Sequence, residues 1–174
     1  MSVFLRGMNK YEMTEVNLNH IESAKLNGKS FTVAITGALT SQEVVFWKLT
    51  TPAAGSFIHW NHKILGSKAS TVELWEVVDG TTGAQVTAYN VNRASANTAG
   101  LNVALGATIT TTGTLIWQRL LPNAQTDAVA SGLDFPMMIL QTNQTYHLKV
   151  ISQAAANTMS YQLNWHEATE RYGR

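Results

Sequence analysis

The segment Met159-Ser160-Tyr161-Gln162-Leu163-Asn164-Trp165-His166 alternates apolar and polar side chains without a break. Successive side chains of a β-strand point to opposite faces of its sheet, so this period of two predicts a strand that is buried on one side only. Antiparallel sheets that pack on a core with one face give this pattern. The segment therefore indicates an all-β protein built from packed antiparallel sheets.

The rest of residues 30–174 contains further strand-like runs separated by turn residues. Tyr146, Leu148 and Val150 alternate with polar neighbours, and Phe135–Leu140 is a continuous apolar run that predicts a fully buried strand. Asp79-Gly80 predicts a hairpin turn, and Pro122–Asp134 is the longest connection. Earlier strands are predicted over Ser30–Ala38, Glu43–Leu49, Phe57–Leu65, Thr71–Val78, Ala84–Val91, Leu101–Leu105, Thr108–Thr112 and Leu115–Leu121. Many short strands at this spacing predict an antiparallel β-sandwich of jelly-roll type.

The composition excludes several classes of protein. Charged residues make up 13% of the 174 residues, whereas soluble domains usually carry about 25%. The net charge of +1 lacks the Lys/Arg surplus that phosphate contacts need, so we expect no nucleic-acid partner. Five Trp, five Tyr and five Phe are untypical of a disordered chain. No apolar run approaches the roughly 20 residues of a membrane span, and none resembles a signal peptide, so we expect a chain made in the cytoplasm without a membrane partner.

The first 29 residues differ from the rest and predict an N-terminal arm or entry segment, followed by one domain over residues 30–174. Seven of the 23 charged residues lie in it, and Asn27-Gly28 ends it with a turn signal. An isolated arm cannot bury its apolar residues, which therefore either pack on their own domain or contact a partner. The candidate interface residues are Val3, Phe4, Leu5, Arg6, Met8, Tyr11 and Met13.

Candidate catalytic and metal-binding groups do not assemble into a convincing site. His59 and His62 lie three apart on one predicted strand, hence on opposite faces, although pairing with His147 or His166 from a neighbouring strand is geometrically possible. Glu73 and Glu76 are likewise predicted on opposite faces, which disfavours a glycosidase pair. The chain has no cysteine, no nucleophile-elbow motif and no phosphate-binding loop. We therefore expect no enzyme, no metal and no cofactor.

The tryptophans allow two interpretations. Trp47, Trp60, Trp75, Trp117 and Trp165 each lie within an apolar or alternating run, which favours core packing over a platform for stacking sugars. Both interpretations describe a binding or structural protein.

Short motifs in the second half carry a resemblance. In order they are Ala88-Tyr89-Asn90-Val91-Asn92-Arg93, Asn97-Thr98, Gly113-Thr114-Leu115-Ile116, Ile139-Leu140 with Thr145–Val150, and Leu163-Asn164-Trp165-His166-Glu167. The chain resembles small proteins encoded among the head genes of tailed bacteriophages, regarded as capsid decoration or cement proteins. The resemblance spans about Ser30 to Glu167. Where that family often ends on Trp-Tyr-Glu, this chain has Trp165-His166-Glu167, and residues 1–29 lie outside the resemblance.

The resemblance implies a structural virion protein on the capsid exterior. It implies a jelly-roll sandwich that forms a homo-oligomer, dimer or trimer, and bridges neighbouring subunits of the major capsid protein. The alternative is a carbohydrate-binding or receptor-binding β-sandwich module of a phage tail or fibre. An enzyme such as a glycan lyase or esterase is the third reading.

Overall fold

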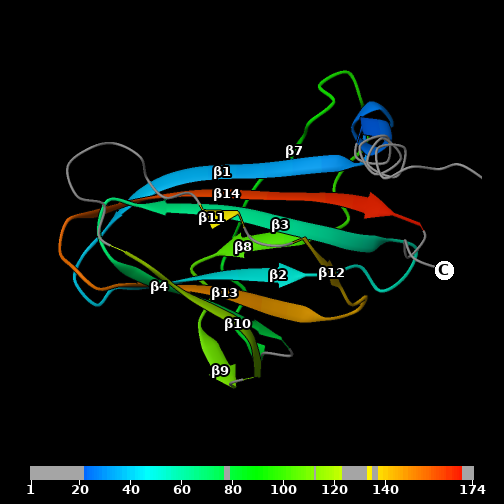
Figure 1. Cartoon of the computed structure of the whole chain (residues 1–174). Coiled ribbons are helices and arrows are strands. Elements are labelled where there is room, and N and C mark those ends of the chain that lie inside the picture. The colour runs from blue at the N-terminus through cyan, green and yellow to red at the C-terminus, as the bar shows by residue number, and fades with distance from the viewer. Residues whose placement is uncertain (1–21, 77–78, 112, 123–132, 135–136, 170–174) are drawn as a thin grey trace, which may run out of the picture.

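The computed structural model describes residues 22–76, 79–111, 113–122, 133–134 and 137–169. Two six-stranded antiparallel sheets lie in two layers, with a two-stranded ribbon beside them (Figure 1). The architecture confirms the predicted all-β sandwich.

The first layer, sheet A, has the strand order β11-β3-β14-β1-β7, with β12 also paired to β3. Its three long central strands bring residues from both ends of the chain together. The bounds are β1 (Ser30–Leu39), β3 (Phe57–Gly66), β7 (Tyr89–Asn90), β11 (Leu133–Asp134), β12 (Met138–Leu140) and β14 (Asn157–Ala168).

The second layer, sheet B, has the order β10-β4-β13-β2-β8-β6, and the ribbon pairs β5 with β9. The bounds in sheet B are β2 (Val44–Thr50), β4 (Ser70–Glu76), β6 (Ala84–Gln85), β8 (Asn102–Leu105), β10 (Thr114–Leu121) and β13 (Thr145–Ser152). The ribbon consists of β5 (Asp79–Gly80) and β9 (Ile109–Thr111), below sheet B in Figure 1.

The core fills the space between the two layers. The apolar residues of the alternating segment 159–166 all face inward: Met159, Tyr161, Leu163 and Trp165 are at most 3% exposed. Facing residues of sheet B, among them Trp47, Leu49 and Leu148, are fully buried. The predicted alternation is thus confirmed at both layers.

Three sequence predictions are wrong in detail. Ala84–Val91 is not one strand, because β6 joins sheet B while β7 joins sheet A as the chain crosses between the layers. Asp79-Gly80 is not a hairpin turn, because Asp79 pairs with Thr111 in the ribbon. The apolar run ending at Leu140 is not fully buried: Met137 is 48% exposed and Ile139 is 44% exposed.

Residues 22–29 are fixed to the sandwich. A short helix over residues 22–26 ends at Gly28, where Gly28 N donates to Lys25 O and Lys29 N to Ala24 O, the paired bonds of a Schellman motif. Gly28 has φ of 64°, and a Cβ there would lie 2.0 Å from Ser95 Oγ, so a glycine is required.

Three asparagine side chains from residues 90–97 bind the backbone at this helix end. Asn92 Nδ2 donates to Leu26 O at 2.8 Å, and Asn90 Nδ2 donates to Gly28 O at 2.8 Å. Asn97 Nδ2 donates to Asn27 O at 3.1 Å. These bonds satisfy carbonyls that the helix itself leaves unpaired. The candidate interface residues Val3, Phe4, Leu5, Arg6, Met8, Tyr11 and Met13 lie outside the described residues.

Candidate functional site

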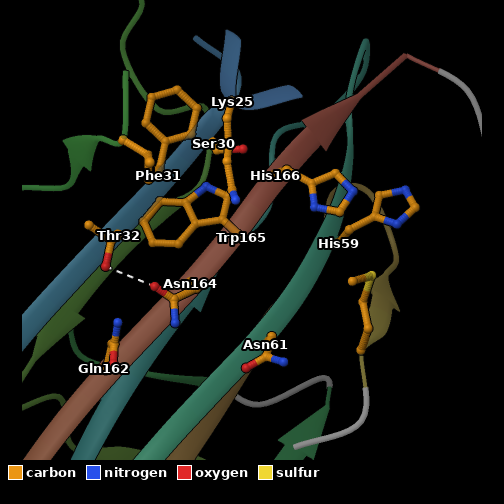
Figure 2. A pocket seen from close by; sticks show the side chains of 12 residues that line it. Lys25, Ser30, Phe31, Thr32, His59, Asn61, Gln162, Asn164, Trp165 and His166 are labelled. Carbon is orange, nitrogen blue, oxygen red and sulfur yellow. Dashed lines mark hydrogen bonds between the residues drawn. The ribbon is translucent and has the colours of Figure 1, made fainter. Parts of the chain in front are cut away.

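A hollow of about 490 Å³ lies on the outer face of sheet A, beside the helix over residues 22–26 (Figure 2). The side chains that β1, β3 and β14 turn away from the core line most of it. The lining residues are Lys25, Ser30, Phe31, Thr32, His59, Asn61, Val91, Met137, Gln162, Asn164, Trp165 and His166.

The polar side of the hollow is built from two cross-strand rows. Pairing places Ser30 opposite His166 and His166 opposite His59. The next outward row has Thr32 opposite Asn164 and Asn164 opposite Asn61. Thr32 Oγ1 donates to Asn164 Oδ1 at 2.9 Å, as the dashed line in Figure 2 shows. This surface therefore presents hydroxyl, amide and imidazole groups.

Exposed apolar side chains border these rows at both edges of sheet A. On the β7 side, Tyr89 is opposite Thr32 and is 54% exposed, and Val91 is 44% exposed. On the β12 side, Ile139 is opposite His59, and Met137 lies two residues before it on the same face. Neighbouring strands are about 4.8 Å apart, so the polar rows lie in a trough between apolar borders roughly 19 Å apart.

Among the described residues that line the hollow, Lys25 carries the only charged side chain. Its Nζ donates to Glu22 Oε1 at 2.6 Å, within the same helix turn. In Figure 2 the Lys25 side chain extends from the helix toward Trp165. The charge at the border of the hollow is thus already paired.

Two histidines stack against each other in the hollow. The rings of His59 and His166 are 4.4 Å apart and nearly parallel at 17°. Burial lowers the pKa of His166 to about 4, with a further contribution from the His59 charge, and burial also lowers the pKa of His59. Both imidazoles are therefore neutral near pH 7 and can donate as well as accept hydrogen bonds.

The outer face of sheet B carries a second surface, of different character. One row runs across four strands, because each residue in it is paired with the next: Leu120, Thr71, Ile151 and Val44. Leu120 is 62% exposed and Val44 is 38% exposed. This row, called the apolar row below, is solvent-facing on a sheet whose opposite face is the core.

The neighbouring row on the same face holds a compensated charge. Glu73 Oε2 accepts from Lys149 Nζ at 3.0 Å and from Trp75 Nε1 at 2.9 Å, and Glu73 Oε1 accepts from Gln118 Nε2 at 3.2 Å. Glu73 is only 8% exposed. The carboxylate is buried with partners on both oxygens, so the Glu73–Lys149 pair adds no net charge to the face.

His147 also lies on this face but is fully buried. Its strand partner Lys48 donates to Gly80 O at 3.1 Å, which places the ribbon over this part of sheet B. Burial lowers the pKa of His147 to about 4, with a smaller contribution from the Lys48 charge. Neither ring nitrogen has a hydrogen-bond partner among the described residues.

No family model and no curated sequence matches this chain.

The structure separates the histidines and acids as their spacing predicts. His59 faces outward, whereas His62 faces the core, where it accepts from Trp60 Nε1 at 3.1 Å. His166 is the histidine that meets His59, and His147 lies on the other sheet. Glu76 accepts from Tyr146 Oη at 2.8 Å, away from the Glu73 cluster. Within the described ranges no group of three His, Cys, Asp or Glu side chains could hold a metal ion.

The tryptophans divide between core and surface. Trp47, Trp60 and Trp165 are buried, as predicted, and Trp117 packs edge-on against His62. Trp75 instead lies on the outer face of sheet B, because it is paired with His147, which lies on that face. Among the helices that the structure describes, none is long and apolar enough to cross a membrane.

The hollow itself was missed at the sequence level. Its polar residues come from three strands that are far apart in sequence, and only their register brings them together. The available signal was the run of Asn, Gln and His on the outward positions of residues 160–166.

Proposed function

We propose that this chain is a structural virion protein that binds the outer surface of a phage capsid and bridges neighbouring major capsid subunits. The observation that supports the proposal is the outer face of sheet B, where the apolar row lies beside the compensated Glu73–Lys149 pair. A surface of this kind can be covered by another protein at low cost.

The physical reason is desolvation. When a partner covers Leu120 and Val44, the free energy of binding becomes more favourable by about 25 cal/mol for each Å² of apolar surface removed from water. An unpaired charge would oppose covering, because a buried charge must be compensated. Here Lys149 and Trp75 already satisfy Glu73, so a docked partner need not supply the missing interactions.

The strand order supports a jelly-roll connectivity. Eight strands form two sets of four, β1-β14-β3-β12 and β2-β13-β4-β10. The chain changes sheet at each connection between them except from β4 to β10, which are neighbours in sheet B. Jelly rolls occur in viral capsid proteins and in lectins, so this connectivity is compatible with the proposal.

Homo-oligomers on the capsid would strengthen the attachment. Each oligomer that contacts several capsid subunits gains affinity through effective concentration. The N-terminal residues from Val3 to Met13 remain candidate contacts for the capsid or for a neighbouring copy. Neither contact requires nucleic acid, a cofactor or catalysis.

The test compares binding to expanded heads assembled without the protein and to unexpanded heads. We expect stoichiometric co-sedimentation of the full chain with expanded heads and weak binding to unexpanded ones. The double variant V44S/L120S should bind at least tenfold more weakly. Val91→Ser is the matched control, since Val91 is a similarly exposed valine at the edge of sheet A.

Two outcomes would refute the proposal. One is a full chain that does not co-sediment with expanded heads. The other is a folded V44S/L120S variant that binds like the parent protein, which would remove the face of sheet B from the contact.

A further inference from the structure

We infer that the hollow on the outer face of sheet A is a binding site for a neutral saccharide. This inference goes beyond capsid attachment and is independent of it, because the two surfaces lie on opposite faces of the sandwich. The volume of about 490 Å³ is within the range of small-ligand sites.

The polar groups of the hollow suit hydroxyl groups. Ser30, Thr32, Asn61, Gln162 and Asn164 line it and carry donors and acceptors without net charge. Sugar hydroxyls are both donors and acceptors, so they need partners of both kinds. Side-chain amides and hydroxyls provide them in one compact set.

One of these amides is held in place with a donor to spare. Thr32 Oγ1 donates to Asn164 Oδ1 at 2.9 Å, which fixes the orientation of the amide. Asn164 Nδ2 makes no hydrogen bond to another described residue. Gln162 lies two residues earlier on the same face of β14 and is exposed. Together they present amide donors from a rigid central strand.

Apolar surface adjoins these groups, as a saccharide requires. Sugar rings have C–H faces as well as hydroxyl edges, and they bind where apolar side chains flank hydrogen-bonding groups. Val91 and Met137 line the hollow with exposed side chains, and Tyr89 is exposed beside Thr32. Pockets that combine apolar walls with a few placed polar groups are typical of ligand sites.

The same lining disfavours other classes of ligand. Among the described residues that line the hollow there is no Asp or Glu, so a metal cation has no carboxylate ligand there. Its one cation, Lys25, is paired with Glu22, which leaves little to hold a phosphate. A lipid chain would cover Asn164 Nδ2 and the exposed Gln162 amide without offering them hydrogen bonds.

The test titrates the full chain with galactose, glucose, mannose, N-acetylglucosamine, lactose and maltose, with N-acetylneuraminate as a charged comparison. Binding is followed by tryptophan emission and by the indole N–H signals in NMR, since Trp165 lines the hollow. We expect saturable binding of at least one neutral sugar, stronger than that of N-acetylneuraminate.

Variants locate the site. Gln162→Ala and Asn164→Ala should each weaken binding about tenfold, the effect of one lost hydrogen bond of ordinary strength. Gln118→Ala is the matched control, because Gln118 is also an exposed glutamine but lies on the outer face of sheet B. It should bind like the parent protein.

The inference is overturned if none of the six neutral sugars gives saturable binding, or if N-acetylneuraminate binds best. It is also overturned if folded Gln162→Ala and Asn164→Ala variants bind like the parent. Head binding of the same variants is measured in parallel. A loss of sugar binding with intact head binding separates this inference from the proposed function.

Discussion

Replacing His147 with leucine should make the protein less sensitive to acid. The ring is fully buried beneath the ribbon, with Phe46 edge-on at a centroid distance of 6.3 Å and Lys48 on the neighbouring strand. Both ring nitrogens lack a partner among the described residues. Protonation would therefore place an uncompensated charge next to a lysine.

The magnitude follows from the pKa of His147, which falls from 6.5 to about 4 on folding. Because the folded pKa is the lower one, the unfolded chain binds the proton first as the pH falls. The contribution of neutral His147 to the free energy of unfolding is fully present above pH 6.5. It is lost as the pH falls from 6.5 toward 4, and it changes no further below that. Between pH 7 and pH 5 the loss amounts to about 2 kcal/mol from this residue.

Urea denaturation of the parent and of His147→Leu at pH 7 and at pH 5 measures this loss. At pH 7 the variant should be at least as stable as the parent, because it removes a buried polar group without partners. On going to pH 5 it should lose about 2 kcal/mol less, a midpoint difference of roughly 1 M urea. His62 and His166, whose pKa values burial lowers to about 4, contribute equally to both proteins.

Tyr161→Phe serves as the control in this experiment. Like His147→Leu, it removes a buried polar group without a partner among the described residues, in this case a hydroxyl. Unlike His147→Leu, it changes no group that titrates between pH 5 and pH 7. Its stability relative to the parent should be the same at both pH values. If His147→Leu shows the same loss between pH 7 and pH 5 as the parent, the account of His147 as a buried, neutral imidazole is refuted.

Two further predictions concern the fold. Gly28→Ala should cost about 1–2 kcal/mol of unfolding free energy for its left-handed backbone, and more where the new Cβ meets Ser95; an unchanged urea midpoint would show that residues 22–29 are not held as described. The two buried tyrosines should respond differently to replacement by phenylalanine. Tyr146→Phe should cost about 1–2 kcal/mol, because Tyr146 Oη donates to Glu76 and accepts from Gln141 N, whereas Tyr161→Phe should be neutral or slightly stabilising. Equal losses in thermal or urea unfolding would contradict the hydrogen bonding described for both.

The alternation of side chains was sufficient to predict which way most strand residues point. Met159, Tyr161, Leu163 and Trp165 face the core because period-two patterning forces one choice of face. The same pattern could not predict what covers the outer faces. His147 reads as an outward, solvent-facing residue, yet it is buried because Lys48 anchors a ribbon formed by residues remote in sequence.

The candidate site was less predictable than the fold. Alternation places Thr32, Asn61 and Asn164 on outward positions, but only the pairing of β1, β14 and β3 brings them into one row. Register between distant strands depends on the whole fold, so a local pattern does not contain it. The apolar run ending at Leu140 misled for a related reason, since β12 lies at an edge of sheet A where one face is not covered by the core.

The strand edges of the sandwich disfavour contacts with other chains through strand pairing. Edge strands invite pairing with other chains unless they are short or irregular. Sheet A ends in β7 on one side and in β11 and β12 beside β3 on the other, strands of only two or three residues, and sheet B ends in β6, with two. The eight-residue β10 is the long edge, and its register shift between Leu115 and Trp117 interrupts regular pairing. With the described edges blunted in this way, the outer faces offer the larger contact surfaces. Since the outer faces of sheets A and B point in opposite directions, the proposed capsid contact and the proposed sugar site do not compete for the same surface.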